Sequence, residues 1–125
     1  MRPSAALLLV LTAACGHGRA AVFAAHVSSP PEDEDGLEGA SGTLDCPGDL
    51  TPQDLGTSDE DGELRAMHMG GVSLACAMNV SKAGYQPYRT LLQDVCTALD
   101  CGRCQTVDVR VVLAPQPGKP TAASQ

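Results

Sequence analysis

The residues of this chain best suited to chemistry are its six cysteines, three of which fall within nine residues. The clustered three are Cys96, Cys101 and Cys104, and the others are Cys15, Cys46 and Cys76. Thiols can close structural disulfides, exchange disulfides as redox catalysts or ligate zinc. The choice among these depends on the compartment of the chain and on the elements that carry the cysteines.

The N-terminus predicts an export signal. Arg2 precedes an apolar run from Ala5 to Ala14, which small and polar residues follow. This pattern is typical of a secretory signal peptide, and the run is shorter than the about 20 residues that a membrane-spanning helix needs. We therefore expect residues 1–20 to be a signal peptide, no membrane span, and a secreted, extracellular mature protein.

Export implies an oxidising environment, in which cysteines form disulfides. If the signal peptide carries Cys15 away, an odd number of candidates remains, which predicts an intermolecular disulfide or a free thiol. The remaining disulfide candidates are Cys46, Cys76, Cys96, Cys101 and Cys104. Cys76 could meet Cys96, and Cys46 could meet Cys101 or Cys104, but the connectivity stays open.

The tetrapeptide Cys101-Gly102-Arg103-Cys104 is similar to the Cys-Gly-x-Cys motif of thioredoxin-like oxidoreductases. The resemblance covers these four residues and implies disulfide exchange. In that family the motif opens a helix, whose N-terminal amides favour the thiolate. Here we expect the motif to follow the end of a helix, where free carbonyl groups disfavour a thiolate. We interpret the cysteines as structural staples, with a secreted thiol-disulfide oxidoreductase using Cys101 and Cys104 as the alternative.

A second resemblance concerns the signal region. The residues from Thr12 to Gly16 are similar to the lipobox of bacterial lipoproteins, which implies that Cys15 is lipidated and becomes the first mature residue. The pattern departs from that of the family at Thr12, where a Leu-like residue is usual. A lipid-anchored surface-binding protein is therefore a further alternative if the source is bacterial.

Acidic residues are concentrated in one part of the chain. Twelve of the fifteen lie between Glu32 and Glu63, a stretch without Lys or Arg. Such self-repelling sequence, poor in apolar groups, predicts that residues 21–65 are mostly disordered. The acidic runs lack the spacing of a calcium loop, and no second cysteine pair offers a zinc site, so we expect no metal. Because no basic cluster is present, we also expect no nucleic-acid partner.

Beyond residue 65 the pattern favours regular structure. The stretch Val72–Val80 alternates between apolar and small or polar residues, as does Thr106–Leu113, and both predict half-buried strands. Between them, the stripe formed by Tyr88, Leu91, Leu92, Val95 and Leu99 predicts a helix over residues 87–100. Gly102 is suited to a left-handed helix cap.

These elements define the predicted fold class, α+β or small α/β, as a minimal strand-helix-strand unit over about residues 72–113. It lies in a small disulfide-stabilised domain, residues 66–114, followed by a disordered Pro-rich tail, residues 115–125. An antiparallel arrangement with an extra strand over Leu64–Met69 is the alternative. With no Trp and Phe23 as the one Phe, so thin a core requires disulfides or a partner.

The sequence Asn79-Val80-Ser81 is an N-glycosylation sequon, and the alternation places Asn79 on the outward face of its strand. No nucleophile has an identifiable base and orienting acid, so we expect neither catalysis nor a cofactor. The sequence therefore favours a small secreted, N-glycosylated, disulfide-stabilised interaction protein: a ligand, a decoy or an accessory subunit of a larger extracellular glycoprotein. Its expected partner is an extracellular protein, disulfide-linked or not, with a homodimer as the other arrangement.

Overall fold

A computed structural model describes residues 20–30 and 36–117, and alternating apolar residues form strands throughout these ranges. In β1 (Ala21–Ser28), Ala21, Phe23, Ala25 and Val27 are buried, whereas the side chains between them point outward. This period of two is the signature of a strand with one face on a core.

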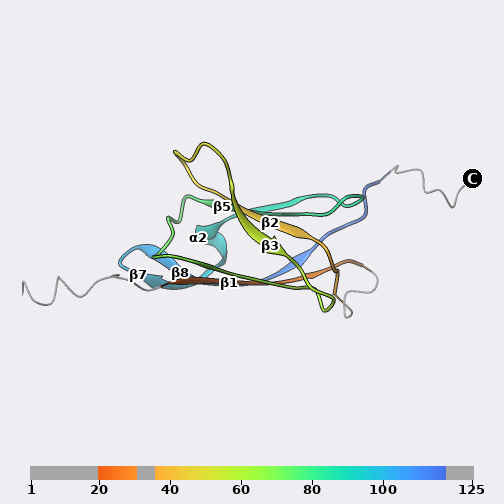
Figure 1. The fold of residues 1–125 in the computed structure, drawn as a ribbon, viewed down its shortest axis with the longest axis horizontal. Coiled ribbons are helices and arrows are strands. Elements are labelled where there is room, and N and C mark those ends of the chain that lie inside the picture. The colour runs from red at the N-terminus through yellow and green to blue at the C-terminus, as the bar shows by residue number, and fades with distance from the viewer. Residues whose placement is uncertain (1–19, 31–35, 118–125) are drawn as a thin grey trace, which may run out of the picture.

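The strands form two four-stranded sheets that face each other as a sandwich (Figure 1). The first sheet has the order β4 (Glu63–His68), β1, β8 (Arg103–Val112), β7 (Cys96–Asp100). The second has the order β3 (Gln53–Thr57), β2 (Ser41–Asp45), β5 (Ala77–Ser81), β6 (Tyr88–Leu91). All neighbours are antiparallel except β1 and β8, which are parallel.

The core lies between the two sheets and is mostly aliphatic. Its largest fully buried side chains include Phe23, Leu44, Leu64, Met78, Leu92 and Leu113. The single helical turn α2 (Leu92–Val95) joins β6 to β7, and the backbone amide of Leu92 donates to the carbonyl oxygen of Cys76. This bond ties the connection between the sheets to the start of β5.

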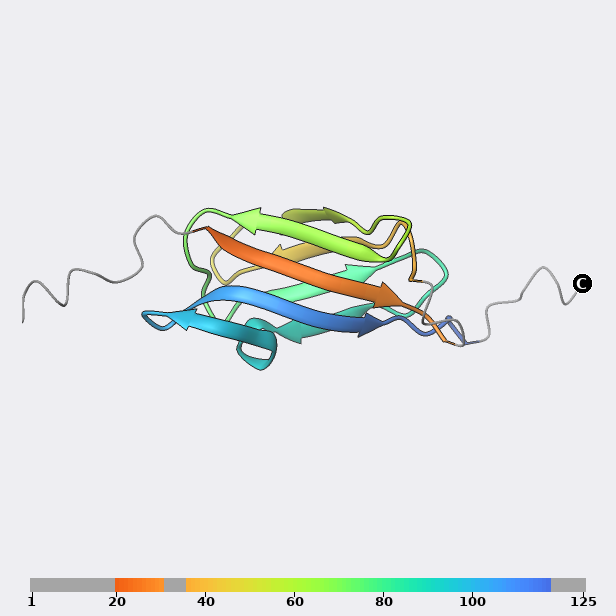
Figure 2. The ribbon, with the colours of Figure 1, turned by 90° about the horizontal axis from the view of Figure 1, so that it is seen from below.

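The parallel pairing of β1 and β8 places the two ends of the described chain at opposite ends of the sandwich (Figure 2). The chain enters next to the β7–β8 turn and leaves beyond β8. Cys46, Cys76, Cys101 and Cys104 lie at the entry end, which we call the cysteine end, and Cys96 is bonded to Cys104.

The predicted strand-helix-strand unit is wrong: the described residues are mostly strand, in two sheets. The helix predicted over residues 87–100 is β6, one helical turn and β7. Two short strands around a turn produced a false helical stripe, in which Leu92 is fully buried while Leu91 and Leu99 are exposed. β6 pairs with β5 and β7 pairs with β8, and these strand pairings outweigh the helical propensity of the segment.

The prediction of disorder over residues 21–65 is also wrong for the described part of that segment, which forms β1, β2, β3 and the start of β4. Its acidic residues lie in turns or on outward faces, while Leu44, Leu55 and Leu64 enter the core. The prediction gave weight to the high density of negative charge and overlooked three leucines that face the core, each on a different strand.

Other predictions are partly confirmed. The alternative strand at Leu64–Met69 exists as β4, although it pairs with β1. The strand predicted at Thr106–Leu113 is most of β8, whereas of Val72–Val80 only the last residues join β5. At the start of the predicted tail, the amide of Gln116 donates to the carbonyl oxygen of Gly84 at 3.0 Å. The predicted signal peptide and lipobox fall on residues 1–19, outside the described ranges except for Ala20.

Candidate binding site at the cysteine end

Two disulfides close within the described residues, Cys46–Cys76 and Cys96–Cys104. Neither matches the pairings suggested by the sequence. The sheet explains the first, because Asp45 lies opposite Ala77 on neighbouring strands, and the next residue of each strand end is a cysteine. Cys101 is also disulfide-bonded, and no cysteine of the described part is free, so the expected unpaired thiol is not found there.

The Cys-Gly-Arg-Cys stretch spans a β-hairpin rather than the end of a helix. Cys101 and Gly102 have φ angles of 55° and 79° and form the turn between Asp100 and Arg103, which are paired. Positive φ at both central residues is typical of the tight turns that match strand twist. Cys104 is bonded to Cys96, so it does not form a redox pair with Cys101. Cys104 is therefore held in a disulfide, which joins two strands rather than the predicted helix and strand.

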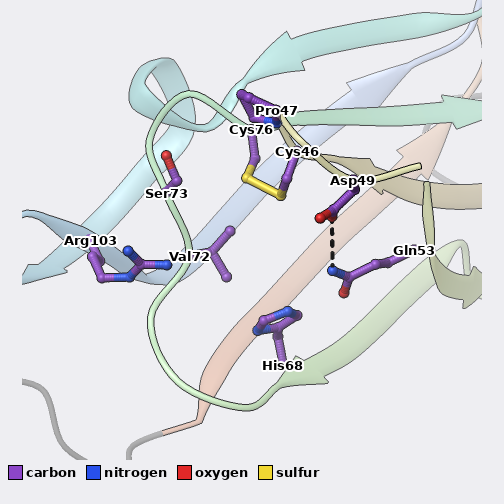
Figure 3. A pocket seen from close by; sticks show the side chains of 9 residues that line it. All are labelled: Cys46, Pro47, Asp49, Gln53, His68, Val72, Ser73, Cys76 and Arg103. Carbon is purple, nitrogen blue, oxygen red and sulfur yellow. Dashed lines mark hydrogen bonds between the residues drawn. A yellow bond between two sulfur atoms is a disulfide. The ribbon is translucent and has the colours of Figure 1, made fainter. Parts of the chain in front are cut away.

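A cavity of about 280 Å³ lies at the cysteine end, beside the Cys46–Cys76 disulfide (Figure 3). The β2–β3 connection, the end of β4, the β4–β5 connection and the start of β8 all contribute to it. Its lining residues are Cys46, Pro47, Asp49, Gln53, His68, Val72, Ser73, Cys76 and Arg103.

The cavity has opposite charges on two sides. Figure 3 shows Arg103 on one side and Asp49 with Gln53 on the other. The Nε of Arg103 donates to the carbonyl oxygen of Gly71 at 3.0 Å, and no carboxylate of the described residues pairs with its guanidinium. Gln53 Nε2 donates to Asp49 Oδ2 at 3.4 Å. A bound group would therefore meet an unpaired cation at one side and an acceptor at the other.

His68 supplies the most informative atom of the cavity. Its Nδ1 is buried without a hydrogen-bond partner, the only side-chain nitrogen or oxygen in the described part of the chain in that state. A buried polar atom without a partner costs about 1–3 kcal/mol, so such atoms need an explanation. The atom has almost no accessible surface, so a group in the cavity does not reach it in this structure.

Exposed apolar residues are next in the sequence to residues that line the cavity. Leu50 is 100% exposed, in the β2–β3 loop that projects from the sandwich in Figure 1. Met69, next to His68, is 82% exposed, and Met67 is 73% exposed. Aliphatic and Met side chains around a charged centre are typical of protein interfaces. We call Leu50 and Met69 the apolar rim.

The other polar groups named by the sequence do not build a second site. On the outer face of the first sheet, His26 Nδ1 and Glu63 Oε2 are 2.7 Å apart. Asn79 is half-buried on β5, and its Oδ1 accepts a hydrogen bond from Arg89 Nη1 at 3.0 Å. Within residues 20–30 and 36–117, no group of three or more His, Cys, Asp or Glu residues could hold a metal ion.

Sequence reasoning missed the cavity because its polar residues come from separate elements. Asp49, His68 and Arg103 are far apart in the chain, and only Arg103 lies in a motif, as the variable residue of Cys-Gly-x-Cys. One signal was present: Pro47-Gly48 and Pro52 mark a turn between Leu44 and Leu55, which is typical of a hairpin. That hairpin would have shown that the acidic segment contributes a loop to an ordered end.

The comparisons with known proteins support the fold only. No protein-family model matches the chain, and no curated protein matches it. Among solved structures, the chain is similar to GBS52, the minor pilin of the gram-positive pathogen Streptococcus agalactiae, with a TM-score of 0.50 and 13% identity. The match covers 83% of this chain and 48% of that one, so the chain spans about half of the pilin structure.

A search of the described residues for membrane spans found no helix of sufficient length and hydrophobicity.

Proposed function

We propose that this protein is a disulfide-stabilised extracellular accessory protein that binds a protein partner through its cysteine end. The observation that carries the proposal is the fully exposed Leu50, which stands in the β2–β3 loop, four residues after the disulfide-bonded Cys46. A large apolar side chain that is held in water gains free energy when a partner covers it. The disulfides support an oxidising compartment, and the likeness to a pilin is compatible with a cell-surface setting.

Position-specific photo-cross-linking in the source cells tests this function. A photoreactive phenylalanine analogue replaces Leu50 in one variant and Ala83 in the control, because Ala83 is exposed in the β5–β6 loop at the opposite end of the sandwich. We expect one dominant adduct from position 50 and none of the same mass from position 83. The purified partner should then bind the wild-type chain and bind L50D at least tenfold more weakly. Equal adducts from both positions would contradict the proposal.

The proposal includes export by residues 1–20 and N-glycosylation at Asn79. The mass of the secreted protein, with and without an N-glycosidase, tests both, and N79Q is the control. We expect cleavage near Ala20 and a glycan mass that N79Q lacks. A secreted wild-type chain from a glycosylating host with no glycan would contradict the glycosylation, and retention of residues 1–20 would contradict the signal peptide.

Lipidation at Cys15 is the alternative, and it is incompatible with an open cysteine end. Ala20, where the described chain enters at that end, is only five positions after Cys15. Five extended residues reach at most about 18 Å. A lipid at Cys15 would therefore hold the cavity close to the membrane, and a mass increase from acyl chains would favour the lipoprotein over the binding protein proposed here.

A further inference from the structure

We infer that the cavity at the cysteine end receives an acidic side chain of the partner protein, whose carboxylate binds Arg103. This inference rests on the proposed function and adds the chemistry by which the partner is recognised. Two features carry it: the guanidinium of Arg103, which has no carboxylate partner among the described residues, and the apolar rim.

Arg103 is prepared for a carboxylate. Arg103 is the first residue of β8, directly after the β7–β8 turn. The hydrogen bond from its Nε to the carbonyl oxygen of Gly71 fixes the side chain. Both terminal nitrogens of its guanidinium are left without a carboxylate partner among the described residues. A planar guanidinium with free N–H groups is well matched to the two oxygens of a carboxylate.

His68 contributes to the wall of the cavity. The ring lies at the side away from Arg103, below Gln53 and Asp49 in Figure 3. Its Nδ1 has almost no accessible surface, so a group in the cavity does not reach that atom.

Asp49 limits what can bind. Its carboxylate lies opposite Arg103 and would repel a second negative charge. A dianion such as phosphate is therefore disfavoured, whereas a single carboxylate on a peptide can face Arg103 and direct backbone N–H groups toward Asp49. The mixed charge of the cavity thus fits a peptide segment.

The volume of the cavity and the apolar residues near it are consistent with a site for one side chain of a partner protein. The cavity of about 280 Å³ lies just below the range of roughly 300–1,000 Å³ for small-molecule sites. The apolar rim offers contact area outside the cavity that an isolated small acid would not use. A partner segment with an acidic residue between apolar residues would occupy both.

NMR titration of the oxidised, ¹⁵N-labelled secreted chain tests the inference. The probes are acetyl-Ala-Leu-Glu-Leu-Ala-amide, the same peptide with Gln in place of Glu, and sodium acetate. We expect the Glu peptide to shift the Arg103 Nε–H and His68 signals with saturation in the millimolar range, and the Gln peptide and acetate to bind at least tenfold more weakly. Equal affinities of the Glu and Gln peptides would show that the carboxylate is not recognised. An affinity of acetate equal to that of the Glu peptide would show that the site does not require a peptide. Either result would overturn the inference.

Variants sharpen the result. Arg103→Gln should weaken the Glu peptide at least tenfold and Asp49→Asn should strengthen it severalfold, whereas Arg110→Gln, on exposed β8 surface, should change nothing. Unchanged amide spectra elsewhere show that each variant is folded. If Arg103→Gln binds like the wild type, the inference fails. A specific adduct at position 50 alongside that failure would leave the proposed function standing without this chemistry.

Discussion

At the scale of single residues, the turn between β3 and β4 depends on glycine. Gly62 has a φ of 81°, and a Cβ added there would collide with the carbonyl oxygen of Val27 and the Cα of Gly36. Its amide donates to the carbonyl oxygen of Asp59, and its own carbonyl oxygen accepts from Val27. The residue therefore lies where the chain crosses close to β1, and no other residue type fits without movement of the backbone.

We predict that Gly62→Ala lowers the free energy of unfolding by more than about 2 kcal/mol, through strain and steric overlap together. The control is Gly48→Ala in the β2–β3 loop, which also has a positive φ, 90°, but has no atom within 4 Å of the added Cβ. It should cost about 1 kcal/mol. Urea unfolding measures the free energy of unfolding of both variants. Equal decreases in the two variants would contradict the packing described for Gly62.

The residue types predicted that the cysteines form disulfides, but they did not predict which cysteines pair. An exported chain with clustered cysteines predicts staples, and Cys104 is one. The convergence of Asp49, His68 and Arg103 could not be predicted, because it depends on how three strand ends meet. The sequence shows Asp49 and His68 only as isolated polar side chains, and Arg103 only as the variable residue of Cys-Gly-x-Cys.

At the scale of elements, the segment from β6 to β7 shows how a short sandwich edge can imitate a helix. Leu92 and Leu99 are equivalent in the predicted helix, seven residues apart on one stripe. In the sandwich, Leu92 is fully buried and Leu99 is 62% exposed. The two positions therefore separate the two folds experimentally.

We predict that Leu92→Ala destabilises the protein by about 2–5 kcal/mol, the usual cost of emptying a buried leucine site. Leu99→Ala should stay within about 0.5 kcal/mol of the wild type, as surface substitutions do. Thermal or urea unfolding measures both. Similar losses at the two positions would support the helix and contradict the sandwich.

The two described disulfides join neighbouring strands but close loops of different length. Cys46–Cys76 closes a sequence separation of 30 and Cys96–Cys104 one of 8. The chain-entropy argument gives about 3.5 kcal/mol for the longer loop and about 2.5 kcal/mol for the shorter one. We predict that C46A/C76A is the less stable of the two double variants in urea. The reverse order would show that local packing, rather than loop closure, dominates.

At the scale of the whole molecule, the first described strand is paired on both sides, between β4 and β8, so the N-terminal part of the chain completes the fold. Its pattern Ala21, Phe23, Ala25, Val27 was readable as a strand, but it adjoins the predicted export signal and precedes the acidic segment. Local alternation predicted β8 well. The order of the sheets could not be predicted, since it depends on long-range pairing that no local pattern encodes.

This arrangement also builds the end of the sandwich that we propose as a binding surface. The β2–β3 loop comes from the segment predicted to be disordered, whereas Arg103 comes from the segment predicted to be ordered. Only a fold that includes both places Asp49 and Arg103 around one cavity, with Leu50 next to Asp49 in the loop. The functional proposals therefore depend on order in residues 21–28 and 41–57.

Backbone hydrogen exchange of the oxidised protein tests that order most directly. We predict that the amides of Phe23 and Val27 in β1 are protected as strongly as those of β8, and that amides of β2 are also protected, because these strands are paired on both sides. If residues 21–28 and 41–57 exchange at the rates of an unfolded chain while residues 103–112 stay protected, the sandwich and the binding site built on it are both wrong.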